Sequence, residues 1–150
     1  MNAARAIATL GGIGYARTAP GTVASAVALP FAYLIAFTGS RFALLVLAIA
    51  VLAIGAWASE LYAAETKTFD PSECVVDELA GQWIACAFAP VSLAGYALAF
   101  VLFRIFDIWK PWPTRRVERL HGGLGIMADD VVAALMAGVI LVALAHTGLI

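Results

Sequence analysis

The chain has 150 residues, of which 63% are hydrophobic and only 13% charged, with a formal net charge of −1 at pH 7. Soluble domains are roughly 45–50% apolar and about 25% charged, so a soluble fold of this composition would expose large apolar patches. The composition excludes a disordered chain, a nucleic-acid-binding protein and most cytosolic enzymes, and it indicates an integral membrane protein.

Charged residues are unevenly distributed along the chain. Arg41 is the only one within 18–58, and none occurs in 79–103 or 131–150. A charged side chain at the centre of a bilayer costs about 2.5–3.5 kcal/mol. The charge-poor stretches are therefore candidate membrane spans, and the clusters of charge mark their ends.

A membrane-spanning helix needs about 20 apolar residues. The first charge-poor stretch is too long for one helix and predicts a helical hairpin over 22–38 and 42–59, whereas the last predicts a single span over 131–150. The middle stretch, 79–103, fits either one proline-kinked helix or a tight hairpin that breaks at Pro90-Val91-Ser92.

The basic residues decide between these two alternatives. With the hairpin, eight of the nine Lys and Arg residues lie on one side of the membrane, whereas a single span divides them six to three. Basic residues concentrate on the cytoplasmic side. We therefore predict one domain over 1–150, an all-α membrane bundle of about five membrane segments in which one hairpin is short or re-entrant. The N-terminus and the loops that carry the eight basic residues face the cytoplasm, and the C-terminus lies outside.

The first span is preceded by Pro20-Gly21-Thr22. This pattern predicts a turn with Thr22 as the N-terminal cap of the helix. The free backbone amides at such a helix end can also bind an oxyanion.

The next polar segment contains Asp70-Pro71-Ser72-Glu73, which fits the cap and first turn of a helix and predicts a helix over 70–89. The helix dipole explains an acid in the first turn. Asp77 and Glu78 lie deeper, where the apolar run begins, and carboxylates there require a cation or another partner. A structural role and a metal-binding or catalytic role are both open for these two residues.

Arg104, Asp107 and Lys110 follow the middle stretch at intervals of three residues, so they project from one face of a helix end. They form either a surface ion-pair ladder or a site for a phosphate group and a divalent metal. The basic stretch 114–120 comes next and serves either as a topology determinant or as an attractor of anionic lipid headgroups.

The glycine-rich stretch His121-Gly122-Gly123-Leu124-Gly125 leads to Asp129 and Asp130, which open the predicted last span. A helix cap explains one of these two acids. The second adjacent carboxylate has no such explanation, and a bound metal would relieve the repulsion between them.

In the five-segment topology, acids, bases and helix N-termini from four separate stretches fall at one depth, the cytoplasmic boundary. A site for the phosphate of a lipid headgroup requires this arrangement. The residues concerned are Thr22, Asp77, Glu78, Arg104, Asp107, Lys110, His121, Asp129 and Asp130.

Four motifs in this order resemble the bacterial phosphatidylglycerophosphatase A family. They are Ala19-Pro20-Gly21-Thr22-Val23-Ala24-Ser25, Val76-Asp77-Glu78-Leu79-Ala80-Gly81, Phe103-Arg104-Ile105-Phe106-Asp107-Ile108-Trp109-Lys110-Pro111-Trp112-Pro113 and His121-Gly122-Gly123-Leu124-Gly125-Ile126-Met127-Ala128-Asp129-Asp130. The resemblance covers nearly the whole chain, although the segment before Ala19-Pro20 is short here. It implies a magnesium-dependent phosphatase of the inner membrane that converts phosphatidylglycerophosphate in the cytoplasmic leaflet into phosphatidylglycerol and inorganic phosphate.

The resemblance does not assign individual roles, and we infer them from residue chemistry. Mg²⁺ prefers oxygen ligands, cationic side chains bind phosphate, and a phosphatase needs a positioned nucleophile and proton donor. The inferred metal ligands are Asp77, Glu78 and Asp129; the phosphate-binding residues are Thr22, Arg104 and Lys110; the catalytic residues are Asp107, His121 and Asp130. Asp130 also fits the metal set, Asp107 fits a metal ligand, a base or a nucleophile, and His121 fits a general acid.

Two other classes of function compete with this one. A small transporter would carry its carboxylates near the bilayer midplane, but the charge-poor stretches contain none. A phosphatase or phosphotransferase that acts on another lipid phosphate is the nearer alternative. The D-G-x-x-A-R…G-x-x-x-D-x-x-x-D signature of one lipid phosphotransferase class is missing from the sequence.

Overall fold

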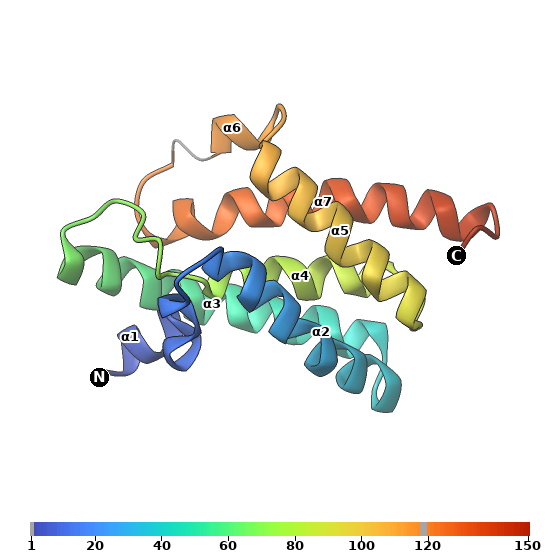
Figure 1. Cartoon of the computed structure of the whole chain (residues 1–150), viewed down its shortest axis with the longest axis horizontal. Coiled ribbons are helices and arrows are strands. Elements are labelled where there is room, and N and C mark those ends of the chain that lie inside the picture. The colour runs from blue at the N-terminus through green and yellow to red at the C-terminus, as the bar shows by residue number, and fades with distance from the viewer. Residues whose placement is uncertain (1, 118–119) are drawn as a thin grey trace.

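A computed structural model of the chain describes residues 2–117 and 120–150 (Figure 1). Within these residues the secondary structure is helical throughout, as predicted, and contains no strand. The elements are α1 (Ala3–Ala8), the 3₁₀ helix η1 (Leu10–Tyr15), α2 (Pro20–Thr38), α3 (Arg41–Thr66), α4 (Val76–Phe88), α5 (Leu93–Trp109), α6 (Thr114–Val117) and α7 (Gly123–His146).

Three of the described helices, α2, α3 and α7, are long and apolar enough to cross a membrane. The chain is therefore a membrane protein. Helices α4 and α5 have 13 and 17 residues. At 1.5 Å per residue they extend about 20 Å and about 25 Å, which is shorter than the roughly 30 Å hydrocarbon core of a bilayer.

The predicted breaks between helices are confirmed. Helix α4 ends at Phe88 and α5 begins at Leu93, so 79–103 is a helical hairpin and not one kinked helix. Ser92 caps α5, with its Oγ accepting a hydrogen bond from the backbone N–H of Gly95 at 3.0 Å. Ser40 caps α3 in the same way, because its Oγ accepts from the N–H of Ala43 at 3.0 Å. A serine at each break satisfies an amide that the new helix leaves unpaired.

The predicted helix start at residue 70 is wrong, because α4 begins at Val76. The backbone N–H of Cys74 donates to the carbonyl of Pro71 at 2.8 Å, and the N–H of Val75 donates to the carbonyl of Ala8 at 2.9 Å. These bonds form a turn and fasten the segment to α1. Asp77 and Glu78 consequently lie in the first turn of α4, and not in the second and third turns of a longer helix.

Two other predicted caps are also wrong. Helix α2 begins at Pro20, after Ala19 in a left-handed conformation with φ 48°, so Thr22 lies inside its first turn. Helix α7 begins at Gly123, eight residues before the predicted start of the last span, and follows Gly122 with φ 81°. Asp129 and Asp130 therefore lie almost two turns inside α7.

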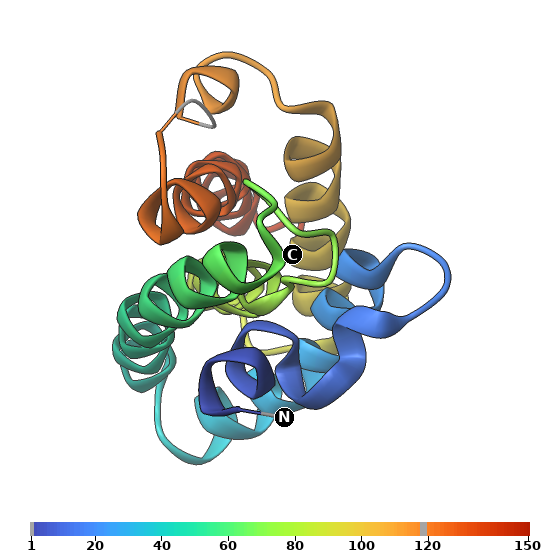
Figure 2. The ribbon, with the colours of Figure 1, turned by 90° about the vertical axis from the view of Figure 1, so that its left-hand side faces the viewer.

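Helix α4 occupies the centre of the bundle and packs against α2, α3, α5 and α7. Figure 1 shows α5 crossing α7 at an angle, and Figure 2 shows the chain arching from the end of α5 to α6. The first turns of α4, the end of α5 and the first half of α7 are thereby brought to one end of the central helix.

Small side chains form much of the core, and large ones cover the outside. Buried alanines recur every four residues along α2, at Ala24, Ala28, Ala32 and Ala36. Trp83 of α4 donates from Nε1 to the carbonyl of Ala28 at 3.0 Å. Large apolar side chains are exposed on the outer surfaces of the long helices. This distribution suits a bilayer, where close helix packing on small residues replaces the hydrophobic drive of a soluble core.

Candidate functional site

The first two residues of the site come from the start of α4. The side chain of Asp77 is buried and that of Glu78 is mostly buried. Asp77 Oδ1 accepts a hydrogen bond from the backbone N–H of Glu78 at 3.1 Å. Ligand oxygens of Glu78 and Asp130 lie within 4.8 Å of that of Asp77.

The end of α5 supplies the two cationic side chains and one more acid. Arg104 Nη1 lies 2.6 Å from Asp107 Oδ2 and 3.8 Å from Glu78 Oε1. Lys110 ends the helix in a left-handed conformation with φ 46°, and its Nζ lies 2.7 Å from Oδ2 of Asp129 on α7. The predicted ladder of Arg104, Asp107 and Lys110 is therefore only partly present, because Lys110 reaches across to another helix.

Helix α7 carries the remaining two carboxylates toward α4. Asp129 and Asp130 are buried, with Asp130 only 2% exposed. A Cβ atom added at Gly81 of α4 would lie 3.2 Å from the Cβ of Asp130 and 2.7 Å from the ring of Phe103. Since such a contact is too tight for a side chain, glycine at position 81 lets both α5 and α7 approach α4 closely.

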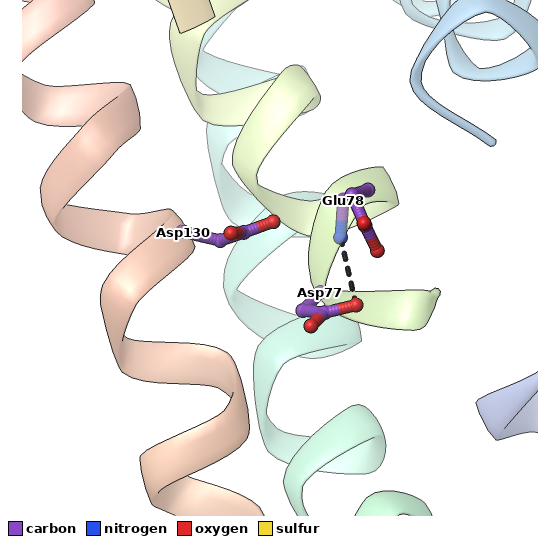
Figure 3. Close-up of side chains that lie close together, drawn as sticks. All are labelled: Asp77, Glu78 and Asp130. Carbon is purple, nitrogen blue, oxygen red and sulfur yellow. Dashed lines mark hydrogen bonds between the residues drawn. The ribbon is translucent and has the colours of Figure 1, made fainter. Parts of the chain in front are cut away.

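The five carboxylates form two overlapping groups, in each of which the oxygens that could bind a metal lie within 4.8 Å of one another. Asp77, Glu78 and Asp130 form the first group, and Figure 3 shows Asp130 pointing from α7 across to α4. Asp107, Asp129 and Asp130 form the second group. Asp130 is common to both.

The donor chemistry of these groups fits Mg²⁺, which binds carboxylate oxygens and water. The Oδ2 atom of Asp130 and the Oε2 atom of Glu78 are buried and accept no hydrogen bond from any described residue. A buried carboxylate oxygen without a donor is costly. A cation at the site would supply the missing partner for both atoms.

The N-terminus of α2 lies directly beside these side chains. A Cβ atom at Gly21 would collide with Oε1 of Glu78 and would lie 3.3 Å from Nη1 of Arg104. Thr22, a predicted phosphate-binding residue, follows Gly21 in the first turn of α2 and is half-buried. Gly21 was not among the predicted site residues, and the signal for it in the sequence is its place beside a proline at a helix start.

His121 is not brought into either carboxylate group. Its side chain is exposed and packs edge-on against Phe69, with ring centroids 5.3 Å apart. Together with Glu60 and Lys67 it lines an open groove of about 300 Å³. Within the basic stretch 114–120, residues 118 and 119 lie outside the described part of the chain.

Glu60 of α3 is a positioning residue that the sequence analysis missed. Its Oε2 atom accepts a hydrogen bond from the backbone N–H of Gly123, the first residue of α7. A carboxylate at a helix N-terminus satisfies a free amide and interacts favourably with the helix dipole. Glu60 therefore acts as the cap of the helix that carries Asp129 and Asp130. In the sequence it is one acid among a cluster of charges, and nothing local marks its partner 63 residues away.

The fold and the site together define a helical membrane protein whose buried acidic centre is bordered by two basic side chains. The chain belongs to the phosphatidylglycerophosphatase A family, whose model matches residues 6–145.

The similarity to curated relatives covers most of the chain. Phosphatidylglycerophosphatase A of Escherichia coli is 38% identical over 90% of this chain and 79% of its own length, and its namesake in Haemophilus influenzae is 36% identical over 90% and 84%. A putative phosphatidylinositol-3-phosphatase of Bacteroides thetaiotaomicron is 37% identical over 87% of this chain and 86% of its own. No solved structure gives a significant match.

Removal of the Glu60 carboxylate tests its role as the cap of α7. We expect Glu60→Ala to lower the free energy of unfolding in detergent by about 1 kcal/mol, because the first amide of α7 loses its acceptor. Glu60→Gln retains a carbonyl acceptor and should keep most of the stability. Glu65→Ala is the matched control, since Glu65 is exposed on the same helix and both of its contacts, a hydrogen bond from Asn2 at 3.0 Å and a 4.0 Å ion pair with Arg5, lie at the surface. Equal stability of the Glu60→Ala and Glu65→Ala proteins, measured by thermal or denaturant unfolding, would contradict the capping role.

Proposed function

We propose that this chain hydrolyses the terminal phosphate monoester of phosphatidylglycerophosphate, with Mg²⁺, to give phosphatidylglycerol and inorganic phosphate. The observation that carries the proposal is the convergence of five carboxylates and two cationic side chains from α4, α5 and α7 in a member of this family. Hydrolysis of a phosphate monoester places negative charge on the phosphoryl and leaving oxygens, so the site must supply positive charge and a positioned nucleophile.

Arg104 and Lys110 are the side chains that would orient the phosphate. Each is held by a carboxylate, Arg104 by Asp107 and Lys110 by Asp129, so both cationic groups are fixed before substrate arrives. Bound Mg²⁺ would supply further positive charge to the phosphoryl oxygens and favour ionisation of a water molecule. The carboxylates of the two groups would hold the metal, and Asp107 and Asp129 are the two acids in closest contact with the cationic groups.

A lipid phosphate is supported by the surroundings of Arg104. The guanidinium contacts Asp107 and Glu78 on one side, and the same residue lines an apolar groove on α5 with Val101, Ile105 and Ile108. A charged headgroup and an apolar tail would find their partners next to each other there. A soluble phosphate ester has no apolar tail that would bind in the groove on α5.

We further propose that the site faces the cytoplasm and that the α4–α5 hairpin supplies the third and fourth of five membrane segments. Eight of the nine basic residues would then lie on the cytoplasmic side, and Arg41 would lie on the other. The two ends of the chain lie at opposite ends of the longest axis (Figure 1), which agrees with an odd number of membrane segments.

Cysteine labelling of sealed, right-side-out membrane vesicles tests the orientation. In a background with Cys74 and Cys86, both buried, changed to alanine, Leu149→Cys should react with a membrane-impermeant maleimide from outside. Arg116→Cys should react only after the vesicles are opened, since exposed Arg116 lies on the proposed cytoplasmic side. Reaction of Arg116→Cys in intact vesicles would overturn the orientation.

Phosphate release by the purified protein tests the activity itself. With phosphatidylglycerophosphate in detergent, a chelator should abolish release, and added Mg²⁺ should restore it. We expect Asp107→Asn and Asp129→Asn each to lower turnover by about 100-fold or more, because each removes a carboxylate that contacts a phosphate-orienting cation. Glu73→Gln, an acid outside both carboxylate groups, should stay within about threefold of the unmodified protein.

Near-normal turnover in both aspartate variants, or turnover that does not change with a chelator, would refute the proposed site. Phosphatidylinositol 3-phosphate is the informative second substrate, because one curated relative is named for it. Faster release from that lipid than from phosphatidylglycerophosphate would assign the chain to the alternative substrate class.

The place of His121 leads to a separate expectation. Its exposed ring packs on Phe69, so the proposed chemistry does not use it, and His121→Ala should keep turnover within about threefold at every pH. A general acid typically contributes 10²–10⁴-fold. A loss of that size together with a changed alkaline limb of the pH–rate profile would restore the catalytic role predicted from the sequence.

A further inference from the structure

The carboxylates of the site divide into two groups that meet at one side chain. Asp77 and Glu78 come from the start of α4, whereas Asp107 comes from the end of α5 and Asp129 from α7. Asp130 belongs to both groups, and its possible ligand oxygens lie within 4.8 Å of those of each.

The burial of Asp130 provides a second observation. The residue is 2% exposed, its Oδ2 atom accepts no hydrogen bond from any described residue, and the side chain points from α7 toward α4 (Figure 3). Its neighbour Asp129 is neutralised by Lys110 at 2.7 Å. Asp130 has no such cation among the described ion pairs, so a cation from outside the described residues would stabilise its ionised form.

The formal charges indicate how many cations the site would hold. Among the described residues, the five carboxylates pair with two cationic side chains, Arg104 and Lys110. With all five carboxylates ionised, this cluster carries a charge of −3. One divalent cation would leave −1, which repels a phosphate monoester that carries about −2 near neutral pH. Two divalent cations would leave +1 and make the site attractive to that substrate.

From these observations we infer that the site binds two divalent cations, one in each carboxylate group, with Asp130 as the ligand common to both. The inference rests on the proposed phosphatase function and deepens it, because paired divalent cations are a general solution for stabilising the attacking and leaving oxygens in phosphoryl transfer. Asp77 and Glu78 would complete one cation site, and Asp107 and Asp129 the other.

Mn²⁺ binding to the full-length protein in detergent tests the inference without reference to turnover. Equilibrium dialysis should give two Mn²⁺ per chain, and electron paramagnetic resonance should show a spin-coupled pair, since one carboxylate joins the two sites. Asp77→Asn and Asp107→Asn should each bind one Mn²⁺ with an uncoupled spectrum. Asp130→Asn should weaken both sites by at least about tenfold. Glu73→Gln is the matched control and should bind two.

One Mn²⁺ per chain in the unmodified protein would overturn the inference. A complete loss of Mn²⁺ binding in both the Asp77→Asn and the Asp107→Asn proteins would also overturn it, provided that both variants keep their helical circular dichroism. If Asp130→Asn fails to fold, the stoichiometry and the coupled spectrum of the unmodified protein still decide. Phosphate release is measured separately. An active protein with one Mn²⁺ refutes only the pair, whereas two Mn²⁺ without phosphate release refutes the proposed function.

Discussion

The excess of buried negative charge at one end of α4 is the constraint on which the rest of the structure depends. Carboxylates from three helices meet there, although only 13% of the residues in the chain are charged. In a medium of low polarity, like charges repel strongly and each buried ion loses its hydration. Arg104 and Lys110 compensate part of this cost by pairing with Asp107 and Asp129. The remainder is not compensated by the described ion pairs, and this uncompensated charge is the reason why we propose that the cluster binds cations.

Close packing is what allows helices to meet at such a cluster. Each of three glycines lies where a side chain would strike a neighbouring helix: Gly21 against Glu78, Gly81 against Phe103, and Gly123 against the backbone carbonyl of Ala56. In a bilayer, helices associate through such small residues. The same residues that stabilise the bundle therefore set the spacing of the site, since α2, α5 and α7 each approach through one of these contacts. A larger residue at any of them would move a functional side chain along with its helix.

The distribution of charge along the sequence predicted the breaks between the helices, whereas local capping patterns misplaced several helix starts. The hairpin break at Pro90-Val91-Ser92 follows from the count of basic residues on each side, which is a property of the whole chain. The predicted helix start at Asp70 failed because Val75 donates its amide to the carbonyl of Ala8, a long-range bond that no local pattern reveals. The sequence predicted that Asp77 lies near other charged groups, because a carboxylate beside an apolar run needs a partner. In the structure it lies with Glu78 and Asp130. Glu60 was missed because its partner is the first amide of α7, a helix whose start the sequence also misplaced.

The relatives separate the chemistry of the site from the choice of lipid. Proteins named phosphatidylglycerophosphatase A and putative phosphatidylinositol-3-phosphatase are 38% and 37% identical to this chain, over nearly the same share of it. Overall similarity therefore does not distinguish a glycerol headgroup from an inositol headgroup. Both names denote phosphatases of a phosphorylated lipid, and under the proposed function the carboxylates, Arg104 and Lys110 would act on the phosphate that the two lipids share. Discrimination between the two lipids would then come from side chains outside the acidic cluster that contact the rest of the headgroup.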